Sequence, residues 1–252
     1  MNPASLEIAV DSPGFAAEAA PFADRLELCS DLEQEGFSPS RSLMTRTLDA
    51  VSDHGTPIHA LVRPLPAGRS GPPRLEDFVL DASLLQRSLD HVSLAGDLGL
   101  QGVVIGAATP AGRPDLDACS LLCERARRYG LEVGFHRAFD LLVDRPAALA
   151  DLAAIGIRRV LSTGGAGWAP APGSHHERAG RLRALAEHAA SLAGHDPRVA
   201  LDVVTCGGIR SGSPPQLLRA TGHLHSSGGR TPEGRLEEVM GLSLLVTSMK
   251  LG

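Results

Sequence analysis

Short apolar segments alternate with longer amphipathic segments along the whole chain. Eight short segments have the apolar, β-prone character of buried strands: 6–10, 25–29, 58–63, 102–105, 131–136, 158–161, 199–203 and 223–225. Helical periodicity follows each of them, at 13–20, 40–52, 77–98, 115–129, 144–155, 175–193, 214–220 and 235–250. The pattern therefore predicts eight successive βα units.

The starts of the predicted helices agree with this division. Ser40, Asp115 and Asp144 stand where N-cap side chains are favoured, and Pro146 suits a first helical turn. Strands that alternate with helices favour a parallel sheet, and eight such units favour closure into a single α/β domain, a (β/α)8 TIM barrel over residues 1–252. A doubly wound open sheet is the alternative. The Pro- and Gly-rich stretch 64–74 is predicted to be a long βα loop within this domain.

Polar residues collect toward the ends of the predicted strands. In a barrel, the C-terminal ends of all strands meet at one face, where loops assemble a site from distant parts of the chain. The residues expected there are Glu7, Glu27, Cys29, His59, Arg63, His136, Arg137, Asp140, Ser162, Thr163, Asp202, Thr205, Cys206, His225, Ser226 and Ser227. Because burying an unpaired charge costs several kcal/mol, we expect these groups to pair with one another or with a ligand.

Composition excludes several classes of protein. A net charge of −5 with one Tyr and one Trp gives little to attract or stack nucleic acid. No apolar run is long enough to span a bilayer, and residues 1–10 lack the features of a signal peptide, so we expect a cytoplasmic protein with four reduced cysteines. The one lysine is Lys250, near the C-terminus, which argues against a Schiff-base aldolase or a pyridoxal-phosphate enzyme, and we expect no nucleotide cofactor.

His136 is the best candidate for acid–base chemistry, because an imidazole titrates near neutral pH. Asp140 or Glu27 is expected to orient it, although Asp140 is equally suited to capping the next loop or helix. Strand alternation places His136 and Arg137 on opposite faces. The candidate catalytic set is His136, Glu27, Arg63, Arg137, Asp140 and Glu7.

Two features suggest binding of a small anion. Arg63 is suited to clamping a phosphate or carboxylate, and Arg137 either does the same or pairs with Glu27. Glycines after the last two strands let backbone N–H groups approach an anion, and serine hydroxyls add donors. This predicts an anion or phosphate site at Gly207, Gly208, Ser226 and Ser227. Tight turns and a bracing ion network are the structural alternatives.

A series of short motifs resembles the signatures of one family. They are LEIAVDS (6–12), ADRLELCSDLEQEGFSPS (23–40), IHALVRP (58–64), VGFHRAFD (133–140), GIRRVLSTGG (156–165), CGGIR (206–210) and LHSSG (224–228). In this order they resemble the copper homeostasis protein CutC family, whose fold is a (β/α)8 barrel. The resemblance implies cytoplasmic copper handling and, as in other members, some self-association into a homo-oligomer.

The resemblance also implies where copper would be bound. Members regarded as copper binders carry a cysteine in the first-strand and second-strand motifs; here the second is Cys29, but Ala9 occupies the first position. Copper(I) prefers soft sulfur ligands, so Cys206 and the nearby His225 complete the candidate metal set with Cys29. Cys119 and Cys123 are expected to pack in the core from an outer helix.

Two functions therefore stay open at the level of the sequence. One is copper(I) binding, and the other is an enzyme or sensor that acts on a phosphorylated or carboxylated metabolite through His136. Loop 64–76 is longer than the family turn and is interpreted either as a lid over the site or as a surface excursion.

Overall fold

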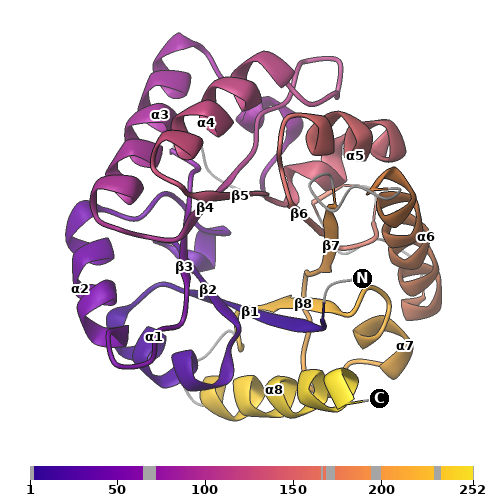
Figure 1. Cartoon of the computed structure of the whole chain (residues 1–252). Coiled ribbons are helices and arrows are strands. Elements are labelled where there is room, and N and C mark those ends of the chain that lie inside the picture. The colour runs from indigo at the N-terminus through magenta and orange to yellow at the C-terminus, as the bar shows by residue number, and fades with distance from the viewer. Residues whose placement is uncertain are drawn as a thin grey trace.

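The strands close into one barrel with helices around it (Figure 1). The computed structural model describes residues 3–64, 72–165, 167–168, 174–193, 200–229 and 234–251. All strand pairs are parallel, in the order β1 to β8, and β1 pairs with β8 through Glu7 and His225. This closure confirms the (β/α)8 barrel and excludes the open sheet, which would leave β1 and β8 as unpaired edges.

The elements follow the predicted order. The strands are β1 (Ser5–Val10), β2 (Arg25–Leu28), β3 (Ile58–Leu61), β4 (Gly102–Ile105), β5 (Glu132–Phe135), β6 (Arg159–Ser162), β7 (Asp202–Thr205) and β8 (His223–Ser226). The helices are α1 (Pro13–Ala19), α2 (Arg41–Val51), α3 (Ala82–Asp97), α4 (Leu116–Arg128), α5 (Arg145–Ala154), α6 (His175–Ala193), α7 (Pro215–Leu218) and α8 (Arg235–Leu251).

Helix caps explain most of the boundaries. Ser40, Asp115 and Asp144 each accept a hydrogen bond from the backbone N–H three residues later, as predicted. The predicted helix 77–98 is instead two elements, because Asp81 caps a new helix through the N–H of Leu84. A 3₁₀ helix, Leu75–Phe78, precedes it. The predicted strand 199–203 is displaced toward the C-terminus and begins at Asp202.

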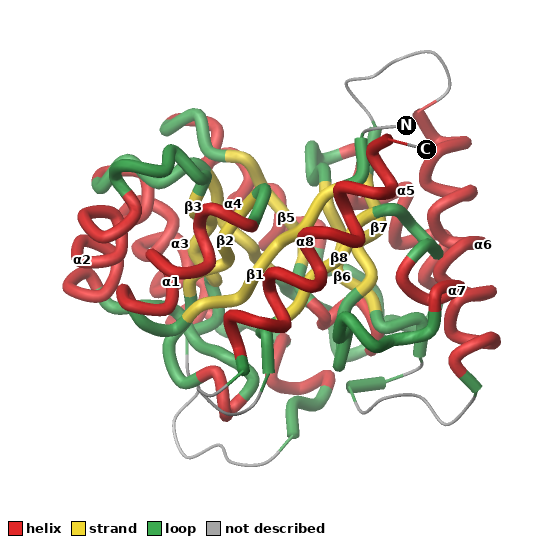
Figure 2. Tube along the Cα trace, turned by 90° about the horizontal axis from the view of Figure 1, so that it is seen from below, coloured by secondary structure: helices red, strands yellow, loops and turns green. Residues whose placement is uncertain are grey.

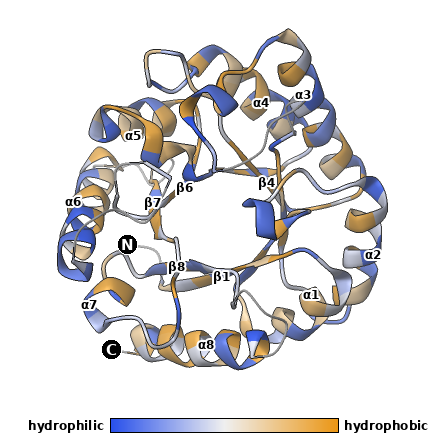
Figure 3. Ribbon diagram, turned by 180° about the vertical axis from the view of Figure 1, so that it is seen from behind, coloured by the Kyte–Doolittle hydropathy of each residue, from blue (hydrophilic) through white to orange (hydrophobic). Residues whose placement is uncertain are grey.

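Two hydrophobic regions stabilise the barrel. The larger one lies between the strands and the surrounding helices, which Figure 2 shows wrapping the strands on the outside. Hydrophilic residues of helices such as α2 and α6 lie on the outer surface (Figure 3). The smaller region is an interior cluster whose members come from strands facing one another: Cys29, Leu61, Val104, Leu161, Val204 and Cys206. Because side chains alternate along a strand, these residues point inward.

No described helix combines the length and the hydropathy that a membrane crossing requires. Residues 65–71 of the long loop after β3, to which the lid and surface interpretations apply, lie outside the described residues.

Candidate functional site

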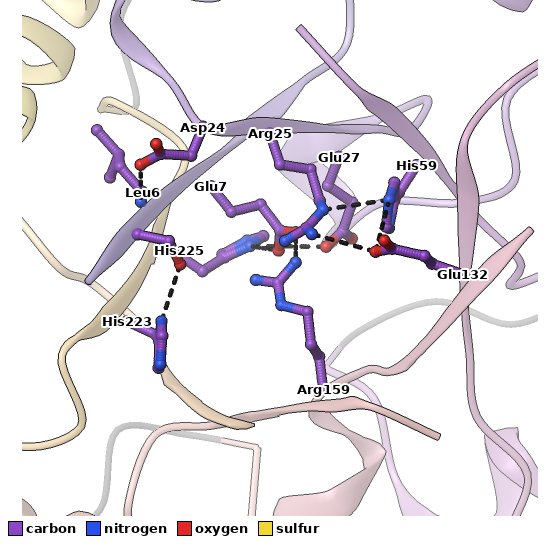
Figure 4. Close-up of polar contacts among 11 residues, drawn as sticks. Leu6, Glu7, Asp24, Arg25, Glu27, His59, Glu132, Arg159, His223 and His225 are labelled. Carbon is purple, nitrogen blue, oxygen red and sulfur yellow. Dashed lines mark hydrogen bonds and ion pairs between the residues drawn. The ribbon is translucent and has the colours of Figure 1, made fainter. Parts of the chain in front are cut away.

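A buried cluster of two carboxylates and one imidazole lies inside the barrel (Figure 4). Glu7, Glu27 and His225 are each the third residue of their strands, β1, β2 and β8. The Nδ1–H of His225 donates to Glu7 Oε1 at 2.8 Å, and Glu27 Oε2 lies 3.6 Å from the same nitrogen. Closure of the barrel brings β8 beside β1 and so unites residues more than two hundred positions apart.

Cationic side chains surround Glu7 from the starts of two other strands. Arg159 Nη1 donates to Glu7 Oε2 at 2.6 Å, and Arg25 Nη1 lies 3.8 Å from the same oxygen. Arg25 also donates to His59 Nε2 at 3.1 Å and to Glu132 Oε2 at 3.2 Å. The result is a continuous network of polar contacts (Figure 4). It lies toward the strand starts, because Arg25, Glu132 and Arg159 are the first residues of their strands.

Burial and neighbouring charges shift the pKa values of this network in opposite directions. Burial raises the pKa of Glu27 to about 7, with a contribution from the charge of Glu7. For Glu7 the effect of burial is outweighed by the hydrogen bond and charge of His225, so its pKa is lowered. Burial opposes the charged form of His225, but Glu27 and Glu7 raise its pKa overall. Burial lowers the pKa of His59 to about 4, and Arg25 adds to this shift. The network therefore favours the cationic form of His225 and the neutral form of His59.

The interior cluster with Cys29 and Cys206 lies beyond this network, toward the strand ends. The Sγ of Cys29 is 3.7 Å from the carbonyl oxygen of Val10, to which it donates. Burial raises the pKa of both thiols, so both are protonated at neutral pH. Cys119 and Cys123 are buried in the outer core on α4, as expected.

His136 lies at the end of β5 with one ring nitrogen unused. Its Nδ1 accepts a hydrogen bond from the N–H of Ala138, which leaves Nε2 as the protonated nitrogen of the neutral ring. That Nε2 is buried and has no hydrogen-bond partner among the described residues. Burial lowers the pKa of His136 to about 3, and the charges of Arg63 and Arg137 add to the shift. The ring also packs over Gly106, where an added Cβ would lie 2.0 Å from it.

The two arginines expected to bind an anion are engaged by protein groups. Arg63 Nη1 donates to the carbonyl oxygens of Glu35 and Gly36, and its guanidinium lies 4.7 Å from the ring centre of Phe37. Arg137 Nη1 donates to Glu35 at 3.0 Å, and its guanidinium stacks 4.4 Å from the ring centre of Trp168. Arg137 therefore pairs with Glu35 and not with Glu27.

Asp140 braces the end of β6. Its carboxylate accepts hydrogen bonds from Ser162 Oγ at 2.6 Å and from the N–H of Thr163 at 2.8 Å. These contacts occupy both carboxylate oxygens. The expectation that Asp140 orients His136 is thus not met, because the acid is committed to the neighbouring strand.

The glycine-rich turns have a structural reason for their composition. Gly207 and Gly208 have φ values of 77° and 72°, and a Cβ on Gly207 would lie 2.4 Å from Thr163. Ser226 Oγ donates to the carbonyl of Ile209, and Ser227 Oγ donates to that of Gly229. Anion binding at these turns stays a prediction.

The candidate residues therefore fall into two groups. Glu7 and Glu27 lie with His225 within the barrel, whereas Arg63, His136, Arg137 and Asp140 lie at the strand ends. Glu7 is not at the rim, because three more residues of β1 follow it and a strand rises about 3.3 Å per residue. His225, expected to join the two cysteines, is held by Glu7 instead. Neither cysteine belongs to the one group of three convergent ligand side chains found among the described residues.

Sequence reasoning missed Arg159 and Trp168 as members of these groups. Arg159 begins β6 and pairs in register with Gly134 of β5. Side chains alternate between the two faces of a strand, so Arg159 points to the same side as Leu161, two residues later, and this side is the barrel interior. This alternation is the signal that could have placed Arg159 inside the barrel. Trp168 lies in a loop, where no periodicity reports on side-chain direction.

The closed ring of eight parallel strands defines a (β/α)8 barrel protein, and this barrel encloses a buried ion network. The sequence model of the CutC family matches residues 4–230. The CutC family protein of Caulobacter vibrioides is 35% identical over 90% of this chain and 82% of its own length. That of Vibrio parahaemolyticus is 30% identical over 96% of this chain and 89% of its own.

The chain belongs to the CutC family. A solved structure has the same fold. It is the crystal structure of a CutC protein of Streptococcus agalactiae, a protein that is named for copper homeostasis, and the match covers 89% of this chain and 98% of that chain. The TM-score is 0.72 at 22% sequence identity.

Proposed function

We propose that this protein handles copper in the cytoplasm by binding copper(I) through Cys29 and Cys206. The observation that carries the proposal is the presence of two free thiols in one small apolar cluster inside the barrel. Family membership supports it, because a structural relative is named for copper homeostasis. Sulfur ligands in an apolar setting suit a soft monovalent ion, which has a low charge to desolvate.

Binding of copper(I) requires both thiols to lose their protons. Burial keeps them protonated without the metal, so uptake of the ion releases protons and becomes tighter as pH rises. The two sulfurs are not held in a preformed group of three ligands. We therefore expect a two-sulfur site that forms as the thiols move toward the ion.

Competition for copper(I) with bathocuproine disulfonate, in the absence of oxygen, tests this proposal. We expect one copper(I) per reduced chain, and a loss of affinity of about tenfold or more in Cys29→Ala and in Cys206→Ala. Cys119→Ala is the matched control, since it removes an equally buried thiol from the outer core. If the double variant Cys29→Ala/Cys206→Ala binds copper as tightly as the native chain, the proposal fails.

A gain-of-function variant provides a second arm. Ala9 is buried on β1, and Ala9 pairs in register with Glu27, two residues before Cys29. Ala9→Cys restores the sulfur position that the resemblance associates with copper binding, at an overpacking cost of about 1–3 kcal/mol. We expect this variant to bind copper(I) more tightly than the native chain.

Binding of a small anion at the strand ends is a second candidate function, favoured by the unused Nε2–H of His136. A buried donor without a partner costs about 1–3 kcal/mol, which an accepting oxygen of a ligand would recover. The charges of Arg63 and Arg137 act on the same ring, so the local field favours an anion. A neutral imidazole donates a hydrogen bond but is not a ready proton donor in this state.

Trp168 makes this second candidate measurable. It is the one tryptophan of the chain, and it stacks on Arg137 and on Phe78, whose ring also packs on His136. Titration with inorganic phosphate and with glycerol phosphate should give a saturable change in tryptophan fluorescence. His136→Phe keeps a ring but removes the donor, and we expect it to weaken binding about tenfold. Equal affinity in His136→Phe and in the exposed control His54→Gln would remove His136 from the site.

A further inference from the structure

We propose that Glu7, Glu27 and His225 form a second metal site, separate from the thiols, that takes a divalent first-row ion such as Zn²⁺. The three side chains each offer one ligand atom, and these atoms lie within 4.8 Å of one another. Glu27 is 6% exposed, and its Oε2 is buried without a hydrogen bond among the described residues. This inference goes beyond copper(I) handling, because it concerns other residues and another class of ion.

The spacing of the ligand atoms suits a coordination sphere. Metal–ligand bonds of about 2.1 Å in a tetrahedral arrangement separate neighbouring ligand atoms by about 3.4 Å. His225 Nδ1 lies 2.8 Å from Glu7 Oε1 and 3.6 Å from Glu27 Oε2. The three side chains come from adjacent strands β8, β1 and β2 and point toward one another (Figure 4). Small side-chain rotations therefore suffice to admit an ion.

The charges at this position favour a cation over the bound proton. Glu7 is neutralised by Arg159 at 2.6 Å. Within the described part of the chain, the one ion-pair partner of Glu27 is His225, at the longer distance of 3.6 Å. With Glu27 ionised, a divalent ion that replaces the Nδ1 proton of His225 contacts both carboxylates, and the displaced proton leaves to solvent. The exchange adds one net positive charge next to the less compensated carboxylate.

The donor set selects the kind of ion. One imidazole nitrogen and two carboxylate oxygens suit Zn²⁺, Mn²⁺ or Fe²⁺, whereas copper(I) prefers sulfur. Three protein ligands also leave a fourth position for water, as in zinc sites that are not purely structural. The two proposed sites would therefore sort ions by ligand chemistry within one barrel.

The network reaches solvent at the strand starts, opposite to the His136 end. Glu132 is the first residue of β5, and its side chain is 61% exposed. It contacts Arg25 at 3.2 Å, which in turn lies 3.8 Å from Glu7. Glu132 therefore belongs to the same ion network but lies outside the group of three ligands, with Arg25 between it and Glu7.

Titration of the reduced protein, first stripped with a chelator, with Co²⁺ and Zn²⁺ tests the proposal. We expect one Co²⁺ per chain, with visible ligand-field bands and no thiolate charge-transfer band, and displacement of Co²⁺ by Zn²⁺. Glu27→Gln should weaken Co²⁺ binding by about tenfold or more. Glu132→Gln is the matched control, because it makes the same chemical change in the same ion network, and it should retain affinity within about threefold.

Further arms separate the possible outcomes. Cys29→Ala/Cys206→Ala should bind Co²⁺ normally, so failure of the copper proposal leaves this result unaffected. The thermal midpoint of the native chain should rise with added Zn²⁺, while that of folded Glu27→Gln or His225→Asn should not. Absence of Co²⁺ binding to the native chain, equal binding by Glu27→Gln, or a thiolate charge-transfer band would each overturn the proposal.

Discussion

Two ion pairs of equal length but unequal burial provide a direct test of what stabilises the barrel interior. Arg159 to Glu7 and Lys250 to Asp24 both have N–O distances of 2.6 Å. The first pair has side chains only 10% and 1% exposed, and the second has side chains 35% and 40% exposed. The same substitution at each cation, Arg159→Met and Lys250→Met, removes one charge while keeping an unbranched side chain.

Burial is expected to decide the magnitude. Removal of Arg159 takes the hydrogen-bond donor from Glu7 Oε2 and leaves Arg25 at 3.8 Å from that oxygen, while His225 still holds the other oxygen at 2.8 Å. Loss of one partner of a buried pair costs about 3–5 kcal/mol, whereas an exposed pair contributes about 0–1 kcal/mol. At about 2–4 °C per kcal/mol for a chain of this size, Arg159→Met should lower the thermal midpoint by about 6–20 °C. Lys250→Met should lower it by no more than about 4 °C.

Urea denaturation followed by circular dichroism measures both free energies of unfolding. The double variant Glu7→Gln/Arg159→Met removes both charges, so it should recover part of the stability lost in Arg159→Met alone. If Arg159→Met and Lys250→Met lower the free energy of unfolding equally, or if the double variant is no more stable than Arg159→Met alone, the described role of the interior network is wrong.

Three further predictions concern other parts of the barrel. The pKa of Glu27 is about 7 in the folded state, against an ordinary value of 4.5, so between these pH values the folded chain binds one more proton at Glu27 than the unfolded chain does. This proton stabilises the fold fully below pH 4.5, and the stabilisation is lost as the pH rises through 7. From pH 5 to 8 the free energy of unfolding of the native chain should therefore fall by up to about 3 kcal/mol more than that of Glu27→Gln, as measured by denaturation at each pH. If the free energies of both chains change equally with pH, this prediction is wrong. Gly106→Ala should destabilise the protein, because the added Cβ would lie 2.0 Å from the ring of His136. Gly180→Ala on α6, where no atom lies within 4 Å of the added Cβ, should stabilise the protein by up to about 1 kcal/mol. Equal unfolding midpoints for the two variants would refute the packing argument. Burial raises the pKa of the cysteine thiols, so iodoacetamide at pH 8 should label four cysteines in the unfolded chain and none rapidly in the native one, as mass spectrometry would show.

Periodicity predicted the fold because local pattern and global closure agree in this chain. Three predicted N-caps, Ser40, Asp115 and Asp144, cap helices in the structure. The barrel topology led us to expect Glu7, Glu27 and His225 among the residues at the strand ends; the structure brings these three together, but inside the barrel. The Asp81 cap, which divides the predicted helix 77–98, lies in a stretch whose apolar spacing does not reveal the interruption.

Depth along the barrel axis was the part that sequence could not supply. The position of a residue along its strand depends on register and strand tilt, which only the closed sheet defines. Glu7 and His136 were therefore assigned to one mouth, although the cluster of Cys29, Leu61 and their neighbours lies between their levels. The partners of Arg137 and Asp140 depend on loop conformation, which has no periodic signal.

X-ray absorption at the copper edge, on reduced protein loaded with one equivalent of copper(I), tests the copper proposal most directly. We expect a first coordination shell of sulfur only, which is lost in Cys29→Ala/Cys206→Ala and unchanged in Glu27→Gln. A first shell of nitrogen and oxygen, or sulfur ligation that survives the loss of both thiols, would contradict it.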